Sequence, residues 1–83
     1  MSRALPRPRP KERFRPLVDG LVESWVCWRE ACEDVRSAYD CWGQSKAAQR
    51  ALAFTSYCAA LDREDQAAHV YSIHVQRVRE VSA

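Results

Sequence analysis

Four cysteines and two histidines are the residues of this 83-residue chain with the most distinctive chemistry. Protein zinc sites use cysteines at short regular spacings such as Cys-x-x-Cys. Cys27 and Cys32 are five residues apart, and so are His69 and His74, so neither pair has that spacing. We therefore predict no metal site and no cofactor, and we expect free thiols that pack as small apolar side chains.

A catalytic cysteine would need a histidine beside it and a pocket around it. Cys32 and Cys58 are the only two cysteines expected to come close together, and both histidines fall nearer the end of the chain. With only two glycines, the chain contains no glycine-rich loop of the kind that binds phosphate. We therefore expect that this protein is not an enzyme.

The N-terminal residues carry a concentrated positive charge. Proline alternates with arginine over residues 5–10, a pattern typical of extended polyproline II structure. We expect a basic flexible tail over residues 1–15, either solvated or bound to a nucleic acid, an acidic protein or a membrane face. The residues that would contact a polyanion are Arg3, Arg7, Arg9, Lys11, Arg13 and Arg15.

The composition and the distribution of apolar residues indicate whether the chain folds and whether it crosses a membrane. A hydrophobic content of 47% is too high for a disordered chain. The basic N-terminus is followed by no apolar region of the kind found in signal peptides, and no apolar run is long enough for a transmembrane helix. We therefore expect one domain, without a transmembrane segment, in the cytoplasm.

Apolar residues recur every seven positions along two lines between residues 18 and 42. The lines alternate three and four residues apart, the pattern of a coiled-coil helix that packs against another helix. We predict one helix over residues 17–42 and a second over residues 46–80. The short connection predicts an antiparallel helical hairpin, so the fold class is all-α and the domain covers residues 16–83.

Local signals at the bend set the expected register. Gly43 is predicted to end the first helix as its C′ residue, and Ser45 to cap the second. Folding about residue 44 pairs positions whose numbers add up to about 89 and sets Trp25 against the carboxylate of Glu64. The residues predicted to pack between the helices are Val18, Leu21, Trp25, Trp28, Cys32, Val35, Tyr39, Trp42, Phe54, Tyr57, Leu61, Ala68 and Tyr71.

Two features predict a second subunit. The second helix is expected to be longer than the first, which would leave residues 73–81 without a partner. Stripes of small residues beside each apolar line would let further helices approach closely. A two-fold dimer that forms a four-helix bundle would cover both features. The predicted oligomer interface is Ala31, Ala38, Ala53, Ala60, Ala67, Ile73, Val75 and Val78.

These expectations favour a small, non-enzymatic oligomerisation or protein-interaction module with a basic tail, most simply a homodimer. One alternative is a nucleic-acid-associated regulator that binds through the Arg/Pro tail. A second alternative is a dimer that binds an apolar small ligand, with Trp25, Trp28, Tyr57 and Tyr71 lining the cavity.

Overall fold

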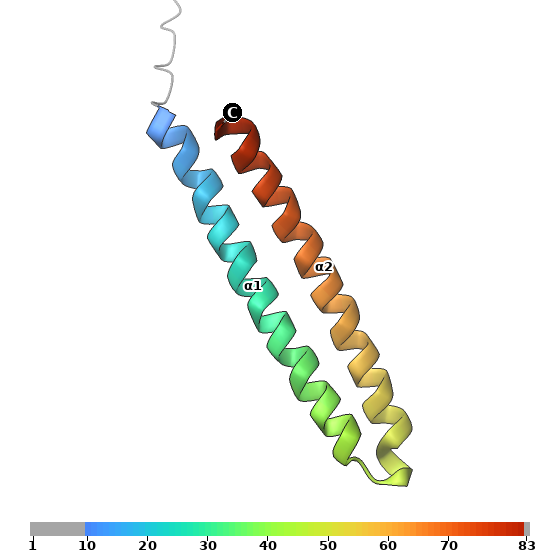
Figure 1. The fold of residues 1–83 in the computed structure, drawn as a ribbon. Coiled ribbons are helices and arrows are strands. Elements are labelled where there is room, and N and C mark those ends of the chain that lie inside the picture. The colour runs from blue at the N-terminus through green and yellow to red at the C-terminus, as the bar shows by residue number, and fades with distance from the viewer. Residues whose placement is uncertain (1–9, 83) are drawn as a thin grey trace, which may run out of the picture.

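The computed structural model describes residues 10–82, which form an antiparallel helical hairpin (Figure 1). Helix α1 spans Pro10–Gln44, the 3-10 helix η1 spans Ala47–Gln49, and helix α2 spans Arg50–Ser82. The all-α hairpin predicted from the heptad pattern is therefore confirmed. Within the described residues, neither long helix combines the length and the apolar composition that crossing a membrane requires.

Helix α1 begins seven residues earlier than predicted, at Pro10. A proline is well suited to the first turn of a helix, whereas Pro16, inside the helix, removes one backbone hydrogen bond. The added turns also have an apolar side, because half-buried Phe14 precedes Leu21 by seven residues. Helix α1 therefore includes residues 10–15, which the sequence assigned to the tail.

The bend between the helices differs from the prediction. Helix α1 continues through Gly43 to Gln44, and neither glycine of the chain has a positive φ angle. Ser45 ends this helix, since its hydroxyl and its backbone N–H both donate to the carbonyl of Trp42, at 2.7 and 3.2 Å. The residue that precedes η1 as N-cap is Lys46, which makes no side-chain capping bond. The predicted roles of Gly43 and Ser45 were therefore wrong.

The longer bend changes the register of the hairpin by about one heptad. Contacting residues of the two helices have numbers that add up to between 92, for Trp28 and Glu64, and 99, for Trp42 and Tyr57. The chain thus folds back about residue 48 rather than residue 44. Because α1 also starts earlier, its first turns lie level with the end of α2, and the predicted overhang of residues 73–81 is absent (Figure 1).

Small side chains form the tightest part of the contact between the helices. Among the described residues only Ala60, 1% exposed, and Ser24, 7% exposed, are buried. The hydroxyl of Ser24 donates to the carbonyl of Leu21 at 2.9 Å, so this buried polar group is satisfied. Four more alanines of the same stripes are half-buried: Ala31, Ala38, Ala53 and Ala67. Small residues allow close helix packing, which is why these stripes lie inside the hairpin.

This placement removes Ala60 from the predicted oligomer interface. A side chain as buried as Ala60 has no surface left for a second copy. Val75 and Val78 are half-buried, and sums of 92–99 place them level with residues 14–24, so α1 of the same chain lies beside them. Ile73 remains 39% exposed.

Candidate interaction surface

Four aromatic rings gather next to the bend, two from each helix. The Trp42 ring stacks on Tyr57 with centroids 5.5 Å apart and an interplanar angle of 18°, and it also contacts Phe54 at 5.1 Å. The Tyr39 ring contacts both Trp42, at 6.0 Å, and Tyr57, at 5.6 Å. The rings pack on one another, so the cluster presents an apolar surface and not a hollow cage.

One side of the hairpin is apolar and open to solvent. Trp25 is 45% exposed and Tyr39 is 54% exposed on α1, while Phe54 is 46% exposed and Leu61 is 38% exposed on α2. These four residues, together with the half-buried residues on the same two heptad lines, are called the aromatic face below. The half-buried residues are Val18, Cys32, Ala68 and Val75.

The aromatic face is open because each helix has three adjacent apolar lines and its partner covers only two. On α1 the covered lines are those of Trp28 and of Ser24, and the line of Trp25 lies at the edge of the contact. On α2 the covered lines are those of Glu64 and of Ala60. Trp25, Tyr39, Phe54 and Leu61 were predicted to lie between the two helices, but their large side chains remain about half exposed.

Glu64 lies beneath the middle of the aromatic face and connects the two helices. Its Oε1 accepts a hydrogen bond from Trp28 Nε1 at 2.9 Å and lies 3.9 Å from Cys32 Sγ. The same Trp28 ring stacks on Tyr71, with centroids 5.4 Å apart. A carboxylate was predicted to accept an indole N–H here, but the donor is Trp28, three residues after the predicted Trp25.

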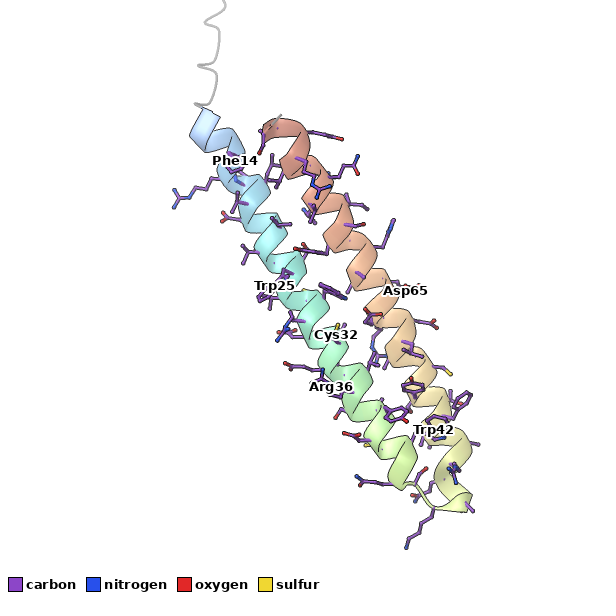
Figure 2. All side chains as sticks on the ribbon, in the orientation of Figure 1. Phe14, Trp25, Cys32, Arg36, Trp42 and Asp65 are labelled. Carbon is purple, nitrogen blue, oxygen red and sulfur yellow. The ribbon has the colours of Figure 1, made fainter. Side chains whose placement is uncertain are left out.

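Charged side chains of both signs flank the aromatic face, since Asp19, Glu33 and Asp40 are exposed beside Arg29 and Arg36 on α1. Arg29 and Arg36 are exposed along the outer edge of α1, and the Arg29 guanidinium carbon lies 5.6 Å from the centre of the Trp25 ring. Asp62 and Asp65 are exposed on α2. Figure 2 shows Trp25 and Arg36 on the α1 side and Asp65 on the outer side of α2.

The opposite side of the hairpin is less apolar. Cys27 follows Trp25 by two residues and therefore lies about 200° around the helix. An open groove on that side is lined by Cys27, Arg63 and Val70 together with smaller residues. A second groove near the bend includes Cys41 and Leu52, which is 73% exposed. Neither groove is lined by the aromatic residues that were predicted to enclose a small ligand.

The other candidate residues are dispersed. Cys27 and Cys41 are exposed, while Cys32 and Cys58 are half-buried, and all four are free thiols. No group of three or more potential metal ligands occurs within the part of the chain that the structure describes. Arg15 is exposed on α1. The remaining predicted polyanion contacts, Arg3, Arg7, Arg9, Lys11 and Arg13, lie outside the residues whose side chains are described.

Comparison with known proteins identifies no relative. No family model, no curated protein and no solved structure matches this chain. The function must therefore be inferred from the hairpin itself.

Proposed function

We propose that this chain is a non-enzymatic helical interaction module that works by self-association, and that its aromatic face forms the contact between copies. The observation that carries this proposal is the exposure of Trp25, Tyr39, Phe54 and Leu61 along one side of the hairpin. Contiguous exposed apolar patches of this kind mark interaction sites more often than ordinary surface. Trp and Tyr are also enriched among the residues that dominate binding energy at interfaces.

The four exposed side chains would supply a substantial part of the contact between two copies. A fully buried aromatic side chain covers about 150–250 Å². Since the four residues are 38–54% exposed, covering them in both copies would remove on the order of 700 Å² of surface from water. Stable dimer interfaces bury about 1,200–2,000 Å² in total, so the rest of the contact must come from the half-buried residues of the aromatic face and from its edges.

A pair of matched double variants tests this proposal. Trp25→Gln/Leu61→Gln removes apolar area from the aromatic face, and Leu52→Gln/Val70→Gln removes it from the opposite side. Glutamine is a good helix former, so both variants are expected to keep the helices. Sedimentation velocity over a concentration series measures the dimer dissociation constant, and far-UV circular dichroism checks the fold.

We expect the wild-type chain to dimerise at micromolar concentration and the aromatic-face variant to weaken the dimer at least about tenfold, since buried Trp anchors carry much of an interface's energy. The variant of the opposite side should dimerise like the wild type. A wild-type chain that stays monomeric at high micromolar concentration would refute the proposal. So would equal weakening by the two variants.

A further inference from the structure

Glu64 is a half-buried acidic residue in the contact between the two helices. Its Oε1 accepts the Trp28 indole N–H at 2.9 Å and lies 3.9 Å from the thiol sulfur of Cys32. Neither the indole nor the thiol carries a positive charge, so the ionised carboxylate depends on water for the rest of its stabilisation. Removing that water would disfavour the charged form of the side chain.

The carboxylate lies among residues of the aromatic face. Leu61 lies one helical turn before Glu64 on α2 and Ala68 lies one turn after it, and both belong to that face. From α1, Cys32 of the same face approaches the carboxylate oxygen. A second copy that covers these three residues would therefore also remove water from Glu64, whichever way round the two copies pair.

The other ionisable side chains near Glu64 do not compensate its charge. Cys32 faces it from α1, and Tyr71 lies two turns further along α2, where its ring stacks on Trp28. The charged side chains at the same height of the hairpin are exposed to solvent: Arg29, Glu30, Glu33 and Asp34 on α1, and Asp62, Arg63 and Asp65 on α2. Acidic side chains outnumber basic ones in this set, so these surroundings favour the neutral carboxyl over the carboxylate.

We propose that self-association of this chain is coupled to protonation of Glu64 and therefore strengthens as the pH falls. This inference rests on the contact through the aromatic face proposed above and adds its regulation. Water stabilises the ionised carboxylate in the separate hairpin, whereas the dry contact favours the neutral carboxyl, so each copy takes up a proton on association. A group that binds its proton more tightly in the dimer makes association more favourable at low pH. The neutral carboxyl keeps an oxygen that accepts the Trp28 N–H, so the contact within the hairpin is retained.

Sedimentation velocity at two pH values and a fixed ionic strength measures this coupling. Between about pH 7.5 and about pH 5, the dimer dissociation constant of the wild-type chain should fall at least about tenfold. The dimer contains two Glu64 side chains, and a gain of about threefold at each multiplies to about tenfold. Far-UV circular dichroism at both pH values checks that the helices are retained.

Two matched variants separate Glu64 from other groups that titrate in this range. Glu64→Gln replaces the carboxylate by a neutral amide whose oxygen still accepts the Trp28 N–H. This variant should lose the pH dependence and dimerise at either pH about as tightly as the wild type does at the lower one. Asp34→Asn removes a carboxylate from an exposed position seven residues after Cys27, on the opposite side of the hairpin, and should keep the full wild-type pH dependence. His69 and His74 are unchanged in both variants, so any contribution from them appears equally in each.

Calorimetry of dimer dissociation provides a measurement on the wild-type chain alone. Dilution in two buffers of different ionisation enthalpy counts the protons exchanged, and the separating copies should release protons between the two pH values. A dissociation that releases none would overturn the coupling even if the glutamine variant failed to fold.

The results that would overturn this coupling differ from those that would refute self-association. A wild-type dimer with the same dissociation constant at both pH values would overturn the coupling and leave self-association intact. So would a pH dependence that persists in Glu64→Gln. A wild-type dimer that weakens as the pH falls would mean that the ionised carboxylate meets a positive charge of the second copy, which also overturns it. A chain that stays monomeric at high micromolar concentration at both pH values would refute both proposals.

Discussion

Replacing Ala60 by leucine should weaken the hairpin far more than the same change one residue earlier. Ala60 is 1% exposed on the side of α2 that packs against α1, whereas Ala59 is exposed. Alanine and leucine are both strong helix formers, so the change hardly alters helix propensity at either position. The difference between Ala60→Leu and Ala59→Leu therefore isolates the effect of packing between the helices.

The magnitude follows from the space at Ala60. Leucine adds three carbon atoms where alanine already leaves no accessible surface. Extra carbons in a well-packed interior cost about 1–3 kcal/mol, and three of them should place the cost near 2–3 kcal/mol. A domain of 60–100 residues loses about 4–8 °C in Tm for each kcal/mol, so we expect Ala60→Leu to melt about 10–20 °C lower. Ala59→Leu should remain within about 0.5 kcal/mol of the wild type.

Urea denaturation followed by far-UV circular dichroism, at one fixed protein concentration, measures both variants. The concentration must be fixed because self-association would add to the apparent stability. If Ala60→Leu and Ala59→Leu have the same midpoint, the helices do not approach closely at Ala60, and the small-residue stripes do not lie inside the hairpin. That result would restore Ala60 as a candidate for the surface between copies.

Two further predictions concern contacts between the helices. A Cβ at Gly20 would lie 3.0 and 3.1 Å from the His74 ring atoms Cε1 and Nδ1, so Gly20→Ala should stabilise a His74→Ala chain by about 1 kcal/mol but gain little in the wild type. Equal gains in urea denaturation would contradict this contact. Glu64→Leu leaves the Trp28 indole N–H without its acceptor and should cost about 1–2 kcal/mol in the wild type, but clearly less in a Trp28→Phe chain. A double-mutant cycle with no coupling would exclude the hydrogen bond.

The sequence was sufficient to predict the hairpin, because two helices with heptad repeats and a short polar connection are compatible with few other folds. Its register depended on a single local feature, the end of the first helix. Gly43 is the residue type that usually ends a helix, yet it keeps a negative φ, and Ser45 ends α1 instead. Helix propensities do not distinguish a helix that ends at Gly43 from one that ends at Ser45. The difference shifts every contact between the helices by about one heptad.

The sequence also did not show which side of each helix faces its partner, and the reason is different. Heptad patterns identify apolar lines but do not rank three adjacent ones. The line of Trp25 and Tyr39 is more hydrophobic than the line that contains Ser24, and it was therefore assigned to the interior. The structure instead buries Ser24 and Ala60, since small side chains let the helix backbones come closest.

Four of the residues predicted to pack between the helices are instead exposed in the structure: Trp25, Tyr39, Phe54 and Leu61. A hairpin has only one internal contact, so it can bury two of the three apolar lines on each helix. The third line can become interior only when another layer of helices covers it, as in a four-helix bundle. Two copies would therefore satisfy the heptad pattern in full, whereas one copy satisfies it only in part.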